Sequence, residues 1–379
     1  MSHINSVELA KSLIRCPSVT PHEQGAISAL VEELAQLGFV CHRLSFNEEG
    51  YDPVENLYAR LGTEGPVFCF AGHLDVVPPG NEAAWTYPPF EPTEKDGFLY
   101  GRGAEDMKAA IAAFTGAVSE FVSKAFRGSI AFMITCDEEG VAVNGTRKIL
   151  DWLKKRNEKI DACIVGEPTN PTTLGEMIKI GRRGSMNCTL TVHGKQGHVA
   201  YPDLAENPVS PLVAMLHAIK GHRLDDGTEF FPPSNLEITT IDVGNPSTNV
   251  IPEKATAHFN IRFNNLHTGK SLEEWLRKTL SAIHVDYNLQ VRVSGEAFLN
   301  PPGMLSDLVS GAVESVTSIK PVLSTTGGTS DARFIKDYCP VVEFGTTGLT
   351  AHKVDERVKI QDVYTLEKIY LEVLKRFFA

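Results

Sequence analysis

Histidine and carboxylate side chains follow four strand-like apolar runs of this sequence. In chain order, these side chains belong to His73, Asp75, Asp137, Glu138, Glu139, Glu167 and His352. Asp106 does not follow a strand but lies at the start of the helix-like run DMKAAIAAF. The crevice beyond the carboxyl ends of the strands is where an open α/β sheet binds its ligands. We therefore expect these side chains to meet in one cleft.

Imidazole and carboxylate groups together suit zinc, and a shared carboxylate suits a site with two metal ions. A metal ion of this kind lowers the pKa of a bound water to about 7, so that the water can attack an amide. In GHLD, one residue could bind a metal while the other orients the His73 ring. Each residue alone also has a common structural role, such as a helix N-cap for Asp106. Because four separate strand ends carry ligand-type residues, the pattern favours a metal site over a set of unrelated structural roles.

Apolar strands that alternate with helices are expected to position these side chains. The expected strands are 67–71, 130–135, 162–165 and 341–344, and the expected helices are 6–15, 23–37, 107–121, 145–155, 305–317 and a last one after 362. Continuous apolar strands between helices are typical of a mostly parallel sheet with helices on both faces. We assign residues 1–180 and 293–379 to this α/β domain, and expect it to hold the metal site.

The pattern changes in residues 181–292. The run SMNCTLTVHG alternates apolar with small or polar residues, as a half-exposed antiparallel strand does. A helix at 208–219, the strands LEITTIDVG and ATAHFNIRF, a helix at 272–283 and the strand LQVRVSG follow. This order predicts an α+β domain of the split βαβ, ferredoxin-like kind, inserted into the first domain.

Composition excludes several classes of partner. There are 47 acidic and 36 basic residues and a formal net charge of −11. A general nucleic-acid or anionic-membrane partner is not expected, because the field of the protein would repel phosphate. The start of the sequence does not read as a signal peptide, and no apolar stretch approaches the ~20 residues of a membrane span. Seven cysteines without a Cys-x-x-Cys pair favour a reduced, cytoplasmic setting.

The motifs resemble the M20 metallopeptidase and deacylase family. The resemblance rests on GHLDVVPPG, YGRGAEDMKA, TCDEEG, GEP and AHKVDE, which occur in that order and span nearly the whole chain. It implies a zinc-peptidase-like catalytic domain that hydrolyses a linear amide. It also implies two Zn²⁺ per subunit, and the ligand types would tolerate Co²⁺ or Mn²⁺ in their place.

The resemblance also implies a role for every residue of the predicted cleft except Asp137. One zinc would be bound by His73, Asp106 and Glu167, and the other by Asp106, Glu139 and His352, so that Asp106 bridges the two. Asp75 would orient His73. Glu138 would be the general base that takes a proton from water and returns it to the leaving amine.

The inserted segment resembles family members whose N-acyl amino acid substrates carry several carboxylates. The implied substrate contacts are Arg182, Arg183, Ser185, Tyr201, Asn249, Arg262, Gly328 and Thr329. Guanidinium groups are well matched to carboxylates, so a small anionic N-acyl amino acid is the expected substrate. The arginines could equally be exposed and make surface salt bridges. His198 would stabilise the oxyanion from the partner subunit of a homodimer that forms through the inserted domain.

Two positions depart from the resemblance. Gly348 lies four residues before His352, where an asparagine is often found, and Glu105 replaces a small residue. Other N-acyl amino acid hydrolases and dipeptidases or aminopeptidases of the family share the metal residues and remain alternatives. A non-catalytic binding protein of the same fold would lack Glu138 or a metal ligand, and none is missing here.

Overall fold

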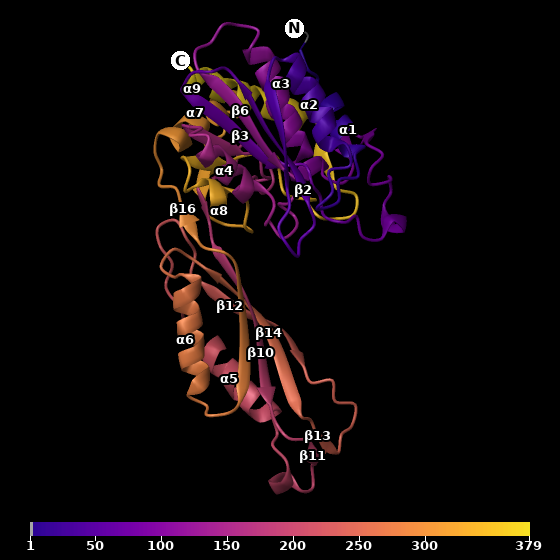
Figure 1. Ribbon diagram of the computed structural model, residues 1–379, viewed down its shortest axis with the longest axis vertical. Coiled ribbons are helices and arrows are strands. Elements are labelled where there is room, and N and C mark those ends of the chain that lie inside the picture. The colour runs from indigo at the N-terminus through magenta and orange to yellow at the C-terminus, as the bar shows by residue number, and fades with distance from the viewer. Residues whose placement is uncertain (1–2) are drawn as a thin grey trace. The chain divides into compact units, whose positions relative to one another are not determined.

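A computed structural model describes residues 3–379, which fold into two compact units. Unit 1 comprises the chain up to Ile180 together with Asn300–Ser324 and Ser330–Ala379, and unit 2 comprises Gly181–Leu299 and Thr325–Thr329. Figure 1 shows the chain coloured by residue number, with the inserted unit in the magenta-to-orange part of the scale.

An eight-stranded sheet forms the centre of unit 1. Its strands, in spatial order, are β1 (Val40–Phe46), β2 (Val54–Leu61), β6 (Ser129–Thr135), β3 (Val67–His73), β7 (Ala162–Val165), β18 (Val341–Glu343), β8 (Met177–Lys179) and β17 (Val322–Ser324). The pairs β6–β3, β3–β7, β7–β18 and β8–β17 are parallel, and the other three pairs are antiparallel. The predicted mostly parallel sheet is confirmed for the central strands.

Helices cover both faces of this sheet. All seven residues of β3 are buried although they alternate between the faces, so both faces must be covered. The helices are α1 (Ser6–Ile14), α2 (Ala26–Gln36), α3 (Ala109–Phe121), α4 (Thr146–Lys155), α7 (Met304–Thr317), α8 (Ala332–Ile335) and α9 (Ile360–Phe377). The helices α1, α3, α7 and α9 pack against one another, whereas α4 and α8 contact each other and the strands β6 and β18.

A small sheet joins two segments that lie far apart in the sequence. It pairs β4 (Thr93–Lys95), β5 (Phe98–Tyr100) and β19 (Arg357–Lys359) in the order β19-β5-β4. A short 3₁₀ helix (Glu82–Ala84) precedes it, and a helical turn (Ala104–Lys108) follows it and leads into α3. Because Arg357 pairs with Tyr100, the segment that contains Asp106 is held close to the segment that contains His352.

Unit 2 is an antiparallel sheet with two helices on one face. The strands β10 (Gly184–His193), β12 (Asn235–Asp242), β14 (Lys254–Phe263) and β15 (Tyr287–Gly295) lie in the order β12-β14-β10-β15. Alternate apolar residues of β10, from Met186 to Val192, pack with residues of α5 (Val209–Lys220) and α6 (Gly269–Ser281). This is the strand order of the split βαβ fold, as predicted.

Short strand pairs lie at the two ends of unit 2. The pair β9 (Gly181–Arg182) and β16 (Phe298–Leu299) adjoins the start of β10. The pair β11 (Gly197–His198) and β13 (Val250–Ile251), followed by a 3₁₀ turn (Pro202–Leu204), lies beyond its other end (Figure 1).

The structure differs from the sequence prediction at the boundaries of unit 2, which also includes Thr325–Thr329, and at the edge of the large sheet. Unit 2 extends to Leu299 rather than 292, because β15 continues to Gly295 and β16 pairs with β9. The antiparallel strands β1 and β2 at the sheet edge were not predicted, because VCHRLSF and VENLYARL mix polar with apolar residues. Within residues 3–379, no helix is both long and apolar enough to cross a membrane.

Candidate active site

The predicted metal ligands lie together in unit 1. His73 is the last residue of β3, Glu139 follows β6 and Glu167 follows β7, and these three strands are parallel neighbours. Their carboxyl ends therefore meet at one edge of the sheet. The atoms of His73, Glu138 and Glu167 lie within 4.8 Å of one another, as do those of His73, Asp106 and Glu139. Residues separated by almost a hundred positions thus form one cluster.

The His73 imidazole is oriented by a backbone group. Its Nδ1 lies 2.9 Å from the carbonyl oxygen of Asp75, and because a carbonyl can only accept, Nδ1 carries the hydrogen. Its Nε2 then presents a lone pair to the cluster, 3.1 Å from Asp106 Oδ1 and 3.7 Å from Glu167 Oε1. This is the arrangement of a metal-binding histidine, whose second ring nitrogen is held by a hydrogen bond.

Asp106 lies between the two histidines of the cluster. One carboxylate oxygen, Oδ1, faces His73 Nε2, and the other, Oδ2, lies 3.2 Å from His352 Nε2. His352 Nε2 also lies 2.7 Å from Glu139 Oε1. A carboxylate that offers one oxygen to each imidazole has the geometry expected of a bridge between two metal ions.

The Asp75 side chain does not orient His73 in the way that the resemblance implies. Its carboxylate lies 3.7 Å from the nearest nitrogen of His73, and it accepts the backbone N–H groups of Glu138 (3.3 Å) and Glu139 (3.0 Å). Asp75 therefore orients His73 through its backbone carbonyl and uses its side chain to hold the turn with the two glutamates. Burial raises the pKa of Asp75 to about 6. The aspartate after β6, Asp137, accepts the backbone N–H groups of Ala142 and Asn144 and so shapes the same loop.

The electrostatics of the cluster fit a cation. Burial, and next the neighbouring Glu167, raise the pKa of Glu138 well above its usual value. Contacts with Asp106 and Glu139 raise the pKa of His352 to about 10. Buried carboxylates crowded in this way repel one another unless positive charge is supplied. The donor set of imidazoles and carboxylates is the set that binds zinc and similar divalent ions.

Two further glutamates connect the ligand segments, and sequence reasoning assigned a role to neither. The Glu105 side chain accepts hydrogen bonds from Thr347 Oγ1 (2.6 Å), Leu349 N (3.2 Å), Thr350 N (2.5 Å) and Thr350 Oγ1 (2.7 Å). Glu105 precedes Asp106, and the loop that it holds leads to His352. The two departures from the family pattern are therefore neighbours, because Glu105 holds the residues on both sides of Gly348.

Glu356 holds the other side of the Asp106 segment. It is fully buried, pairs with Arg102 at 2.6 Å, and accepts the backbone N–H groups of Gly103, Glu105 and Asp106 at 2.9–3.1 Å. The only sequence signal was that Glu356 ends the motif AHKVDE and Arg102 lies in YGRGAEDMKA. Both glutamates fix where Asp106 lies relative to its neighbours.

The arginine group lies near the start of β10 in unit 2. Arg182 is buried, and its guanidinium Nη1 donates to the Gly328 carbonyl at 3.2 Å. Arg183 Nη1 donates to Asn235 Oδ1 at 3.0 Å. Burial, and next the charge of Arg262, lower the pKa of Arg183. Two guanidinium groups that repel each other would be stabilised by an anionic ligand.

Other predicted substrate residues occupy both ends of unit 2. Ser185 is paired with Arg262 across the β10–β14 ladder, and Thr329 belongs to the short segment with Gly328. Tyr201 and Asn249, by contrast, are exposed beside His198 at the opposite end of β10. The eight residue steps from Ser185 to His193 span about 26 Å at about 3.3 Å per step. One chain therefore does not bring its own His198 to its own arginine group.

Comparison with known proteins identifies the class of this fold and site. The family model of peptidase family M20/M25/M40 matches residues 69–376, and the chain belongs to this family. A curated succinyl-diaminopimelate desuccinylase from Rhodospirillum centenum is 58% identical over 375 residues, which are 98% of this chain and 97% of the relative.

Solved structures of more distant proteins share the fold. An M20 family metallo-carboxypeptidase from Sulfolobus solfataricus matches with a TM-score of 0.79 at 17% identity, covering 100% of this chain and 99% of that chain. A Bacillus subtilis protein described as a dinuclear metal-binding peptidase of the M20 family matches with a TM-score of 0.71 at 15% identity, covering 100% and 99%. At these identities the likeness shows the fold.

Proposed function

We propose that this protein removes the succinyl group from N-succinyl-L,L-2,6-diaminopimelate and releases diaminopimelate and succinate. This is a step of lysine biosynthesis. The observation that carries the proposal is the convergence of two histidines and four carboxylates in a chain 58% identical to a curated desuccinylase. The reaction adds one water across one amide bond.

The metal site would hold two divalent ions, with zinc as the proposed metal. His73, Asp106 and Glu167 would hold one ion, and Asp106, Glu139 and His352 the other. The position of Asp106 between the two imidazoles supports this division. When bound, such ions polarise a carbonyl and make water more acidic. Cobalt and manganese accept the same ligand types and should substitute.

Glu138 would move the proton during hydrolysis. Its carboxylate takes a proton from the attacking water as the oxygen bonds to the amide carbon. It then gives that proton to the nitrogen as the carbon–nitrogen bond breaks, so no net proton is gained or lost. The burial that raises the pKa of Glu138 favours a group able to hold the proton between these steps.

Arg182, Arg183 and Arg262 would bind carboxylates of the substrate. Ser185, Gly328 and Thr329 lie in the same part of unit 2 and would contribute hydrogen bonds. The Arg183 and Arg262 charges are close enough for Arg262 to lower the Arg183 pKa, which supports an anion between them. Three guanidinium groups would also overcome the repulsion that a chain of charge −11 exerts on an anionic substrate.

His198, Tyr201 and Asn249 would act on the site of a partner subunit. His198 is exposed, and its Nδ1 accepts the backbone N–H of Ala200 at 3.1 Å, which leaves Nε2 to donate to an oxyanion. The length of β10 separates His198 from the arginine group of its own chain, and this supports a homodimer with sites completed in trans. A cytoplasmic location is proposed from the seven free cysteines, five of them buried.

A substrate panel tests this function. The purified zinc-loaded protein should hydrolyse N-succinyl-L,L-2,6-diaminopimelate with a kcat/KM about 100-fold or more above that for N-acetylornithine or dipeptides. Chelation should abolish turnover, and added zinc should restore it. Preference for N-acetylornithine would instead make the chain an acetylornithine deacetylase. Full turnover after complete removal of metal would contradict the metal mechanism.

A further inference from the structure

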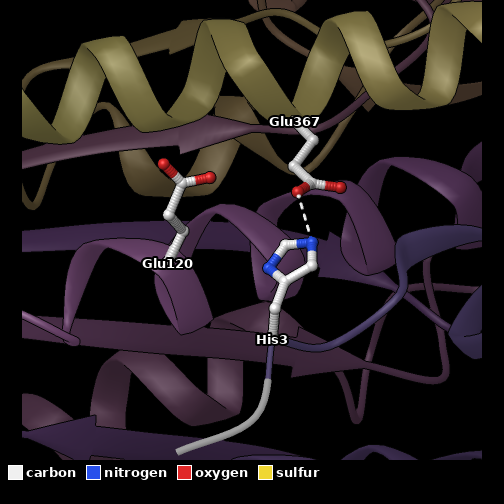
Figure 2. Close-up of side chains that lie close together, drawn as sticks. All are labelled: His3, Glu120 and Glu367. Carbon is white, nitrogen blue, oxygen red and sulfur yellow. Dashed lines mark ion pairs between the residues drawn. The ribbon is translucent and has the colours of Figure 1, made fainter.

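A second group of ligand-type side chains lies in the helical layer of unit 1. It consists of His3 from the N-terminal segment, Glu120 from α3 and Glu367 from α9, which Figure 2 shows gathered from three parts of the chain. One ligand atom of each residue lies within 4.8 Å of the other two. The group is separate from the active-site cluster, because Glu120 lies near the end of α3 that is remote from Asp106. The twelve residues from Ala109 to Glu120 span about 17 Å.

The His3 ring is held with one nitrogen directed at the carboxylates. Ser119 Oγ donates its hydrogen to the Gly116 carbonyl at 2.7 Å, so at His3 it can only accept. His3 Nδ1, 3.2 Å from Ser119 Oγ, therefore carries the hydrogen and donates it. His3 Nε2 then presents its lone pair 3.2 Å from Glu367 Oε1. His73 is held in the same way, with Nδ1 donating and Nε2 facing carboxylates.

Glu367 is seated in a place prepared for a carboxylate. Its side chain is only 9% exposed, and its Oε2 accepts a hydrogen bond from Ser6 Oγ. A Cβ at Gly116 would lie 2.9 Å from the Glu367 carboxylate, so only glycine at position 116 leaves room for it. With Oε2 bound by Ser6, Oε1 is directed toward His3. This carboxylate is therefore fixed in position rather than free to turn to solvent.

An ion pair between His3 and Glu367 would leave the Glu120 carboxylate without a cationic partner in this group. The lone pair of a neutral His3 would face a carboxylate oxygen, which is repulsive unless a proton or a cation lies between them. A proton on Nε2 would pair with one negative charge, and Glu120, which like His3 is exposed to solvent, brings a second carboxylate into the group. A divalent cation would balance both carboxylates and use the Nε2 lone pair. One imidazole and two carboxylates form a three-ligand set that zinc accepts, with water completing the coordination.

We propose that His3, Glu120 and Glu367 bind one divalent transition-metal ion, for which Zn²⁺ is the best-matched probe. The ion would tie the N-terminal segment to α3 and α9. Because α3 and α9 pack against each other and against α1, the site would stabilise the helical layer of unit 1. It would do so without contact with the residues proposed for hydrolysis, and it does not depend on the proposed function.

Metal counting tests the site directly. The full-length protein and the variants His3→Ala and Glu120→Gln are dialysed against buffers of fixed free Zn²⁺, and bound zinc per chain is measured by mass spectrometry. We expect the wild type to bind one zinc more than either variant. The matched control Glu32→Gln, an exposed glutamate on α2, should bind as many as the wild type. Hydrolytic activity should be unchanged in all three variants. Equal zinc content at every free Zn²⁺ concentration would overturn the proposal.

Thermal unfolding distinguishes a metal site from an ion pair. If a metal ion binds there, raising free Zn²⁺ should raise the melting temperature of the wild type by a few degrees more than that of His3→Ala, because a ligand stabilises the state that binds it. If only an ion pair is present, His3→Ala should lower the melting temperature equally with chelator and with zinc. The second result would refute the site even if both proteins fold normally.

Discussion

Substitution of Glu105 tests whether a buried carboxylate positions two metal ligands at once. One side-chain oxygen of Glu105 accepts two hydrogen bonds from Thr347 and Leu349, and the other accepts two from Thr350. In Glu105→Gln, one oxygen becomes an amide NH₂ that cannot accept. The Thr350 hydroxyl has another acceptor, the Arg357 carbonyl at 2.9 Å, but the Thr350 backbone N–H loses its partner. Hydrogen bonds to charged groups contribute about 1.5–3 kcal/mol each, so we expect a loss of about 2–3 kcal/mol.

This loss should appear as weaker metal binding. The Thr350 segment leads to His352, and Glu105 is adjacent to Asp106, so a loosened contact lets both ligands move. Removal of groups that support metal ligands typically weakens binding 10- to 100-fold, or about 1.4–2.8 kcal/mol, which agrees with the hydrogen-bond estimate. Titration of metal-free Glu105→Gln with zinc in the presence of a chromophoric chelator should therefore give a Kd raised by that factor. Activity should fall at limiting zinc and recover at excess zinc.

A control variant shows whether the effect on zinc affinity is specific to Glu105. Glu176→Gln also removes a carboxylate that accepts hydrogen bonds from a threonine loop, at Thr172 and Thr173. Those hydrogen bonds are exposed, and the nearest predicted ligand, Glu167, lies five residues before Thr172. Glu176→Gln should leave zinc affinity unchanged. Wild-type zinc affinity in Glu105→Gln would refute the positioning role. An activity loss that saturating zinc does not restore would place Glu105 in the chemistry itself.

Glu138→Gln should bind metal as the wild type does, but its kcat should fall by at least about 100-fold because the group that carries the proton is removed. Loss of metal with normal activity per bound metal would contradict the role of Glu138 as general base. Burial alone would raise the pKa of Asp225, but hydrogen bonds from Ser234, Gly227 and Asn264 lower this pKa to about 2. The ionised Asp225 side chain therefore stabilises the fold above about pH 4, and this stabilisation disappears as the pH falls through 2. Urea unfolding should show Asp225→Asn less stable by about 2 kcal/mol at pH 6, and the difference should shrink toward pH 2; a constant difference would exclude the ionised group as its source. The inactive variants His198→Ala and Glu138→Gln are mixed so that their subunits exchange. If His198 acts in trans, the mixture should regain about 25% of wild-type activity, because half the dimers then have one intact site of two. No recovery of activity in verified mixed dimers would refute the action of His198 in trans.

The sequence alone predicted the features that depend on neighbouring residues. Apolar runs such as VFCFAG and ACIVG predicted buried strands, and the helices that begin near Ser6 and Thr146 were found within a few residues of their expected limits. Ligand-type residues at strand ends could be recognised because parallel strands end at a common edge. The change from continuous apolar runs to alternation marked the inserted unit. These signals arise from periodicity within a few residues of one another.

Tertiary structure decided the contacts that periodicity cannot encode. The sequence contains GHLD, but only the fold shows that the Asp75 backbone orients His73 while its side chain holds the turn with Glu138 and Glu139. Glu105 and Glu356 are further examples, since each contacts a partner more than 240 positions away. A carboxylate in a motif has the same local sequence whether it binds a metal or supports a ligand. Which of these it does depends on the atoms that folding brings within hydrogen-bonding distance, and those come from distant parts of the chain.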